Sequence, residues 1–291
     1  MNEALLFFIK DYITILALLF VAIFVIGTLR TYISARKLQR TLAKQPKIIA
    51  HTGASLFGAI TPFCSCSSIP LFMGFLEARI PLGVSLSFLI TSPLVNEYMA
   101  VLMLAAFGWK VALLYISAGI LLGIIGGMVL GRMDLEKHLV KDVAAREVKE
   151  VKYVSFAQRT RFGLHEATDI TKKLWLWILA GVALGAIIHN MVPEEFFTSM
   201  VSRTGIFSVP LAVILGVPLY GSSAALVPVA QALFAKGVPL GTTLAFVMAT
   251  AALSFPEAII LRRVMKLRLI LTFFGVVAIG IVLVGYLLNL V

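Results

Sequence analysis

The sequence predicts an all-α polytopic membrane protein with an inverted repeat, in which each half has three transmembrane helices and one re-entrant helical hairpin. Three observations predict this fold: the apolar composition, two apolar segments interrupted at their centres, and the placement of the basic residues. Of the 291 residues, 60% are hydrophobic and 13% are charged, and the mean hydropathy is +1.01. No soluble domain of this length could bury so much apolar surface, so we expect the chain to lie in a bilayer.

Several apolar segments are close to the roughly 20 residues that a helix needs to cross a bilayer. We expect unbroken spans at residues 12–33, 81–107, 110–131, 174–191, 239–261 and 268–290. Two further segments, 53–77 and 206–236, are apolar but contain clusters of Pro, Ser and Gly near their centres. Backbone groups left unpaired by such a break are tolerated at membrane depth only where they are buried in protein or line a cavity. We therefore expect these two segments to form hairpins inside the protein.

The basic residues predict how the chain crosses the membrane. They concentrate at residues 30–47, 132–173 and 262–268, and the middle group holds ten Lys/Arg against seven Asp/Glu. Cytoplasmic loops carry an excess of Lys and Arg, so we expect all three groups to lie inside. If all three groups are cytoplasmic, the chain must cross the membrane an even number of times between one group and the next. The count is even if segments 53–77 and 206–236 turn back within the membrane and only the six unbroken segments cross it. This topology inverts one half relative to the other and places 21 of the 25 basic residues in the cytoplasm.

These boundaries divide the chain into a first membrane repeat (1–133), a charged cytoplasmic loop (134–173) and a second membrane repeat (174–291). A short sequence match supports the repeat. Pro70-x10-Pro81-Leu82-Gly83 recurs as Pro228-x10-Pro239-Leu240-Gly241, at an offset of 228 − 70 = 158 residues. Inverted repeats with discontinuous helices near the bilayer midplane are typical of many secondary transporters.

One predicted span has a regular glycine pattern. Segment 110–131 carries glycine at every fourth position from Gly119 to Gly131. This spacing places the glycines on one face of a helix, where another helix can approach closely. We expect a packing role for this face and assign it no chemistry.

Both cysteines of the chain lie at the break of the first hairpin. Cys64 and Cys66 are soft ligands, suited to thiophilic cargo such as Cu(I), Zn(II) or trivalent arsenic, and a turn at Ser65 could point both sulfurs into one cavity. Cysteine also packs as a small buried hydrophobe, and that alternative stays open. The second break offers hydroxyl groups but no thiol. We predict a substrate site formed by Cys64, Ser65, Cys66, Ser67, Ser68, Asn96, Tyr220, Gly221, Ser222 and Ser223, with Cys64 and Cys66 as candidate ligands for a soft metal or metalloid.

Glu97 and Glu257 are the carboxylates that this topology places inside the bilayer, and each follows a helix-breaking proline. An ionisable side chain at the bilayer centre costs about 2.5–3.5 kcal/mol on insertion scales, so it usually faces the interior and marks a pathway. We predict a role for both in proton coupling. The alternative is that each caps the helix after its proline, which is compatible with that role.

His165, Glu166 and Asp169 form a polar group just ahead of a predicted span. They are candidates for a regulatory or metal-entry cluster. The alternative is a polar helix N-terminus, where acidic residues are favoured by the helix dipole.

Three strings resemble those of the YraQ/ArsP-type predicted permeases: Pro-Phe-Cys-Ser-Cys-Ser-Ser-x-Pro at 62–70, Thr-Ser-Pro-x-x-Asn-Glu at 91–97 and Gly-x-Pro-x-Tyr at 216–220. His165-Glu166 ahead of a segment ending in Val192-Pro193 fits the same pattern. The resemblance covers most of the chain and is weakest over 134–160. It implies a permease and gives importance to the tip from Cys64 to Ser68. The arsenic branch of the family is associated with efflux of trivalent organoarsenicals, but the resemblance does not carry over a cargo.

We therefore expect a membrane permease, and not an enzyme, that acts as a secondary transporter. It would move a small solute, either a thiophilic metal or metalloid species or a small anion, through a midplane site between the two hairpin tips. Two alternatives stay open. One is a membrane-embedded thiol redox or sulfur-transfer protein that uses Cys64 and Cys66, and the other is a passive channel.

The expected partners are a small-molecule or ion substrate and membrane lipid, with homo-oligomerisation left open, and no cofactor is expected. The formal net charge of +11 could suggest nucleic acid, but basic cytoplasmic loops give the same total, so no nucleic-acid partner is predicted. We expect a multi-pass protein of the cell (plasma) membrane with the large loop 132–173 in the cytoplasm.

Overall fold

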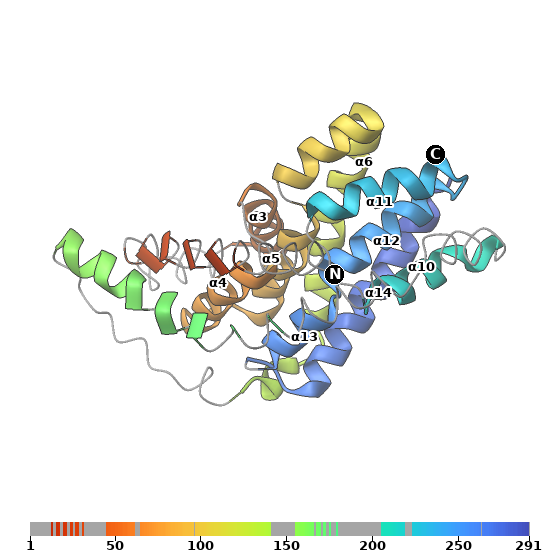
Figure 1. Ribbon diagram of the computed structural model, residues 1–291. Coiled ribbons are helices and arrows are strands. Elements are labelled where there is room, and N and C mark those ends of the chain that lie inside the picture. Colours follow the sequence, from red (N-terminus) through yellow and green to blue (C-terminus); the bar gives the residue numbers. More distant parts are fainter. Residues whose placement is uncertain are drawn as a thin grey trace.

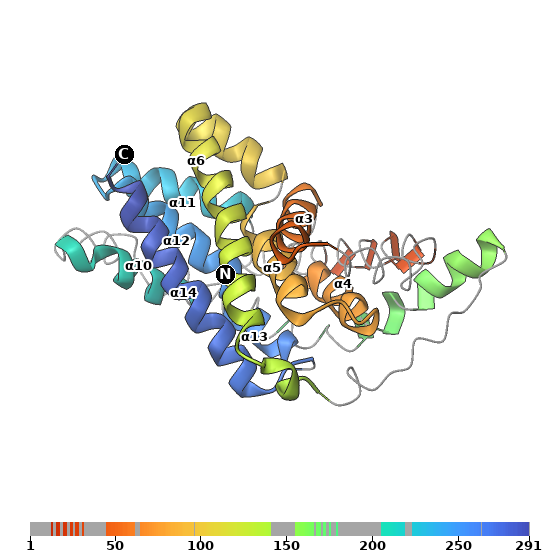
Figure 2. The same cartoon turned by 180° about the vertical axis from the view of Figure 1, so that it is seen from behind.

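The computed structural model describes residues 45–61, 65–95, 97–140, 155–165, 205–218, 223–262 and 264–290, together with single positions within 13–31 and 167–179. Within these residues the regular elements are helices, apart from an isolated antiparallel bridge between Leu139 and Met265. Figures 1 and 2 show the helices from opposite sides. The prediction of an all-helical fold with helices suited to a membrane is thereby confirmed.

In the first half, the described helices are α3 (Lys47–Ile60), α4 (Ser65–Glu77), α5 (Leu82–Leu94) and α6 (Glu97–Gly131), followed by the 3₁₀ turn η1 (Leu135–His138). Pro46 and Pro81 stand directly before α3 and α5. Proline suits a helix start because it lacks an N–H that the helix would leave unpaired there. Helix α6 is bent at Gly108, whose φ of 81° lies in a region that favours glycine.

In the second half, the described elements are the 3₁₀ turn η2 (Gly205–Phe207), α10 (Ser208–Gly216), α11 (Ser223–Ala235), α12 (Leu240–Ala252), α13 (Phe255–Leu261) and α14 (Leu267–Leu288). Pro239 stands before α12, as Pro81 stands before α5. Pro256 lies in the first turn of α13, where its missing N–H breaks no intrahelical bond.

The helix boundaries of the two halves coincide at the offset of the sequence match. Helices α11 and α12 begin and end 158 residues after α4 and α5 (65 + 158 = 223 and 82 + 158 = 240), and α13 begins 158 residues after α6 (97 + 158 = 255). The bend at Gly108 corresponds to Lys266 (108 + 158 = 266), which directly precedes α14. The same order of helices and breaks is therefore present twice.

Helix α5 packs on the second part of α6 through the predicted glycine face. The contacts pair Gly119 with Val95, Gly123 with Thr91 and Gly127 with Ser87. The contact residue number rises by four along α6 as it falls by four along α5, so these two helices run antiparallel. A Cβ added at Gly127 would lie 2.7 Å from the backbone oxygen of Gly83. The packing role predicted for the glycine face is confirmed.

A second close contact occurs in both halves. A Cβ at Gly58 would lie 3.0 Å from the backbone oxygen of Phe88, and a Cβ at Gly216 would lie 3.1 Å from that of Phe246. The two pairs are again 158 residues apart (58 + 158 = 216 and 88 + 158 = 246). Helix α10 therefore packs on α12 as α3 packs on α5.

Helices α6 and α14 lie side by side and run antiparallel (Figure 2). The chain after α6 meets the start of α14, because the Lys266 N–H donates to the carbonyl of His138 at 2.8 Å. Further along, a Cβ at Gly280 would collide with the side chain of Leu122. Because 122 + 158 = 280, equivalent positions of the two halves face each other at this crossing.

Helices α5 and α12 form the centre of the described structure. Every residue of α5 is buried, as is every residue of α12 except Leu240 and Ala251, and the two helices contact each other. Large apolar side chains are exposed on the outer helices, for example Leu113 of α6 and Ile279 of α14. A helix buried on all sides belongs to the interior of a bundle, whereas exposed apolar faces suit contact with lipid.

Three described stretches are long and apolar enough to cross a membrane: Met99–Gly131, Leu240–Leu261 and Leu267–Leu288. The segments 81–107 and 239–261 were predicted to be unbroken, but the helices stop at Leu94 and Ala252 and resume at Glu97 and Phe255. Pro93 explains the first break, because a proline ring in a helix clashes with the preceding turn and removes a hydrogen bond. The predicted spans 12–33 and 174–191 lie largely outside the described residues.

Candidate functional site

The first predicted hairpin tip is followed by helix α4. This helix begins at Ser65, so Cys66, Ser67 and Ser68 stand in its first turn, and Ser65 starts a helix rather than forming the centre of a turn. Ser68 is fully buried. Cys64 and the side chains of Ser65, Cys66 and Ser67 lie outside the described residues. The first turn of a helix offers backbone N–H groups without intrahelical partners, and its dipole favours negative charge.

The second tip has the same relation to α11. Ser223 is the first residue of this helix and the counterpart of Ser65 (65 + 158 = 223). Tyr220, Gly221, Ser222 and the side chain of Ser223 lie outside the described residues. Each predicted tip is thus followed by a helix of 13 residues that starts with serine.

Glu257 is the predicted carboxylate whose side chain the structure describes. It is the third residue of α13 and is only 1% exposed. Helix α13 contacts α4, which carries Cys66 and Ser68. A buried carboxylate is costly unless its surroundings compensate, so this position is inside the protein rather than toward lipid. Glu97 is the first residue of α6, but its side chain and the whole of Asn96 lie outside the described residues.

The halves contact each other in a reciprocal way. Helix α4 of the first half contacts α13 of the second half. The counterpart of α4 is α11, and the counterpart of α13 is the first part of α6. These two counterparts also contact each other. Phe107 of α6 and Phe234 of α11 pack edge to face with ring centroids 5.7 Å apart. Paired contacts of this kind are what two equivalent units make across a twofold axis. Each tip helix therefore packs against the segment that follows a helix break in the opposite half.

Two buried hydroxyl contacts tie α3 to α5 in the first half. His51 Nδ1 lies 2.8 Å from Ser87 Oγ, and Ser55 Oγ lies 2.6 Å from Thr91 Oγ1. Ser55 also donates to the carbonyl of Ile120 in α6 at 2.9 Å. These residues were not predicted from the sequence as site residues. A signal was present, since polar residues four apart at 51 and 55 are matched by residues four apart at 87 and 91.

The second half lacks these pairs. The counterparts of the four residues are the apolar residues Val209, Val213, Ala245 and Ala249. The described polar contacts from α12 to other helices lie at its start, where Ser208 Oγ is 3.1 Å from Thr242 Oγ1 and the Gly241 N–H donates to Asn289 Oδ1 at 2.7 Å. The interface between α3 and α5 is therefore more polar than the interface between α10 and α12.

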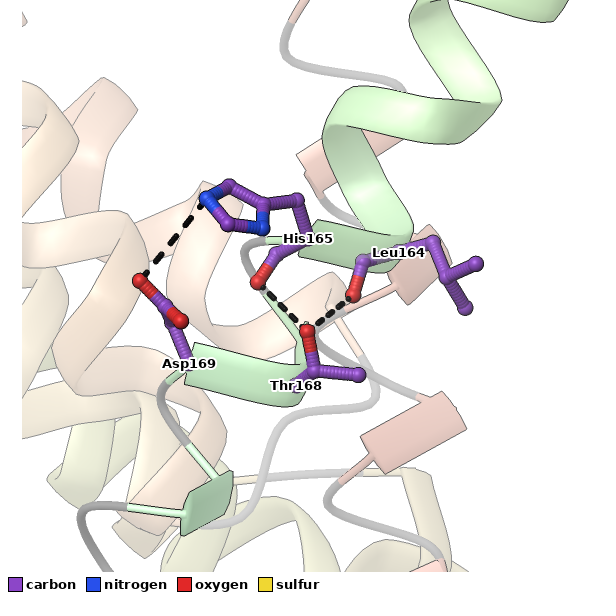
Figure 3. A network of polar contacts seen from close by, with 4 residues as sticks. All are labelled: Leu164, His165, Thr168 and Asp169. Carbon is purple, nitrogen blue, oxygen red and sulfur yellow. Dashed lines mark hydrogen bonds and ion pairs between the residues drawn. The ribbon is translucent and has the colours of Figure 1, made fainter.

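Figure 3 shows the polar contacts among Leu164, His165, Thr168 and Asp169. His165 Nε2 and Asp169 Oδ2 are 4.0 Å apart, with side chains 77% and 52% exposed. Thr168 Oγ1 donates to the carbonyls of Leu164 and His165, each at 2.9 Å. Glu166 lies outside the described residues. Among the residues that the structure describes, no group of three or more His, Cys, Asp or Glu is placed to hold a metal ion.

Comparisons with known proteins identify the relatives of this chain. A Methanocaldococcus jannaschii protein, UPF0718 protein MJ0584, is 20% identical over 84% of this chain and 83% of its own length. A Streptococcus mutans protein, named as a proposed subunit of a two-component membrane permease complex, is 24% identical over 68% of this chain and 66% of its own length. The Escherichia coli UPF0718 protein YraQ is 24% identical over 79% of this chain and 65% of its own length. No solved structure matches the chain.

The family-level match covers nearly the whole chain. The family model ArsP_1, described as a predicted permease, matches residues 1–290. This match agrees with the apolar helices and with the resemblance drawn from the cysteine string. The chain therefore belongs to the ArsP_1 family of predicted permeases.

Proposed function

We propose that the chain is a secondary transporter of the cell membrane that moves a small solute between two hairpin tips at mid-depth of the bilayer. Its family supports a transporter rather than an enzyme. The observation that carries the proposal is the double occurrence of one series of broken helices, with each tip helix packed against the opposite half. Broken helices are typical of transporters, in which the interrupted backbone lines a binding site.

The two helices of the first predicted hairpin, α3 and α4, are too short to cross the bilayer, which supports a re-entrant hairpin. Helices α3 and α4 have 14 and 13 residues, or about 21 and 20 Å at a rise of 1.5 Å per residue, against a hydrocarbon core of about 30 Å. The start of α3, where the chain enters this hairpin, and the start of α5, which follows the hairpin, also lie at the same depth in the protein. Near the start of α3, His51 lies beside both Gly83, at the start of α5, and Gly131, at the end of α6.

An inverted relation between the repeats is supported by α6 and α14. The second part of α6 corresponds to α14, and these neighbouring helices run antiparallel. The contact of Leu122 with Gly280 suits a pseudo-twofold axis through this crossing. We propose repeats at 1–133 and 174–291 with hairpins at 53–77 and 206–236, and a cytoplasmic loop at 134–173.

The two tips supply different chemistry to the proposed site. Thiols at Cys64 and Cys66 favour a thiophilic metal or metalloid species, whereas the helix N-termini that begin at Ser65 and Ser223 favour a small anion. We assign solute contacts to residues 64–68 and 220–223, with Asn96 at the neighbouring break. A trivalent arsenical is a suitable test solute for the thiols, because its arsenic is thiophilic, and each thiol that binds the arsenic releases one of its hydroxyl groups as water.

Glu257 is proposed to carry the coupled proton. Its carboxyl group is buried in the helix that packs on α4, which is the helix that follows the first predicted tip. Glu97 opens α6 after the corresponding break in the first half and is proposed for the same role. A carboxyl group that is alternately protonated and ionised links solute movement to a proton gradient.

The proposed partners are a small solute and membrane lipid. The name of the Streptococcus mutans relative also suggests a protein component, either a second copy of this chain or another subunit. The mass of the purified particle in detergent, measured by light scattering, distinguishes a monomer from a homo-oligomer.

Uptake of phenylarsine oxide by proteoliposomes tests the proposed function, with protein-free vesicles as the baseline. We expect saturable uptake by the wild type, and its loss when Cys64→Ser and Cys66→Ser are combined. Gly275→Ala is the control, because an added Cβ there has no atom within 4 Å. Unchanged uptake in the cysteine variant would reduce the thiols to a packing role. Flux that rises linearly with concentration would instead indicate a channel.

A further inference from the structure

Tyr115 of α6 carries a hydroxyl group that the described part of the chain leaves without a hydrogen-bond partner. The side chain is fully buried, and its hydroxyl has no hydrogen-bond partner among the residues that the structure describes. A buried hydroxyl without a partner costs free energy, and native proteins rarely keep one without a reason such as a bound molecule.

The hydroxyl cannot be satisfied by a small rotation. Thr243 also has an unpaired buried hydroxyl, but a threonine in a helix can rotate toward a carbonyl one turn earlier. The hydroxyl of Tyr115 stands at the far end of a rigid ring, away from the backbone of its own helix. A partner must therefore come from outside α6.

The second repeat shows that packing requires the ring but not the hydroxyl. The counterpart of Tyr115 is Phe273 (115 + 158 = 273), which is 1% exposed. Both halves therefore bury an aromatic ring at this position, and only the first half adds a polar group. The hydroxyl is a candidate for function because the fold is built without it in the other repeat.

Continuing the register of α6 along α5 brings Tyr115 to the level at which α5 ends. This tyrosine is one turn from Gly119, which packs on Val95 directly after the end of α5. One further turn along α5 would face Tyr115, but α5 ends at Leu94 and the chain continues as α6 from Glu97. The lipid-facing side of α6 is the opposite one, where Leu113 and Ser117 are exposed.

We propose that the Tyr115 hydroxyl donates a hydrogen bond to the transported solute as it passes the first helix break. The solute then carries an oxygen acceptor, as an oxyanion or a hydroxylated metalloid does. A phenol stays protonated near neutral pH, so it serves as a donor to either. This inference rests on the proposed transport function and assigns it a residue that neither tip contains.

Tyr115→Phe tests the inference, because Phe273 shows that the bundle accepts phenylalanine at this position. We expect kcat/KM for phenylarsine oxide uptake into proteoliposomes to fall roughly three- to tenfold, the effect of losing one hydrogen bond. The melting temperature in detergent is expected to equal or exceed that of the wild type, since an unsatisfied group is removed. Ser117→Ala is the matched control; its hydroxyl bonds the Leu114 carbonyl on the lipid-facing side, and uptake should not change.

Three outcomes would overturn the inference. Wild-type kcat/KM in Tyr115→Phe would show that the solute does not use the hydroxyl. A lowered melting temperature would show that the hydroxyl is bonded within the protein itself. A wild type that takes up no phenylarsine oxide would contradict the proposed function for this solute, and with it the inference that depends on it. The first two results leave the proposed function standing.

Discussion

Gly127→Ala tests whether the close approach of α5 and α6 holds the first half together. An added Cβ would lie 2.7 Å from the Gly83 oxygen and 2.9 Å from the Cβ of Ser87, and would collide with Ser87 Oγ. Non-bonded carbon atoms favour separations of about 3.5–4.0 Å, so the helices must move apart by roughly 1 Å. Overpacking of this kind costs about 1–3 kcal/mol. If Ser87 is also displaced from His51, a buried hydrogen bond worth about 0.5–1.5 kcal/mol is lost.

The assay is the melting temperature of the purified protein in detergent, followed by size-exclusion chromatography after heating. At about 2–4 °C per kcal/mol for a chain of this size, the summed cost of about 1.5–4.5 kcal/mol predicts a fall of roughly 3–18 °C. Gly275→Ala is the control, since alanine there meets no atom within 4 Å and is favoured over glycine in a helix by about 0.5–1 kcal/mol. A melting temperature for Gly127→Ala equal to that of Gly275→Ala would refute the packing argument.

Three further predictions address coupling, topology and the polar interface. Glu257→Gln should flatten the pH dependence of uptake while leaving a folded protein; a wild-type pH profile would remove Glu257 from proton coupling. Reporter fusions after residues 50 and 150 should both score cytoplasmic, and opposite locations would contradict the re-entrant hairpin. Ser55→Ala should lower stability by about 1–2 kcal/mol, because it removes contacts to two helices. Thr272→Ala, which removes an exposed hydroxyl bonded within its own helix, should change the melting temperature little by comparison.

Local sequence patterns predicted much of the fold, because each reports a constraint that acts within one or two turns. The apolar composition predicted membrane helices, and the glycines from 119 to 131 predicted a packing face. The clusters of Pro and Ser predicted interruptions, which are present between Ile60 and Ser65 and between Gly216 and Ser223. The break after Leu94 lies inside a predicted continuous span, because the apolar residues on both sides outweighed the signals of Pro93, Asn96 and Glu97. Long apolar runs therefore predict a span better than they predict the continuity of its helix.

Some residues of the candidate site could be proposed from the sequence, and others became apparent only from the structure. Sequence alone proposed the cysteine tip, the serine tip and Glu257 as site residues, since thiols and carboxylates are conspicuous in apolar surroundings, and these proposals stay predictions. It did not identify His51, Ser55 or the hydroxyl of Tyr115, which look like ordinary residues until their neighbours are known.

By itself, the sequence determined that this chain is a helical membrane protein, that its helices are interrupted near 61–64 and 217–222, and which family it resembles. The tertiary structure decided which helices meet: α4 with α13, α11 with α6, and α6 with α14 at Leu122 and Gly280. The physical reason is that periodicity and composition describe one helix at a time. Contacts between residues 36 or 158 positions apart depend instead on how closely two helix faces fit.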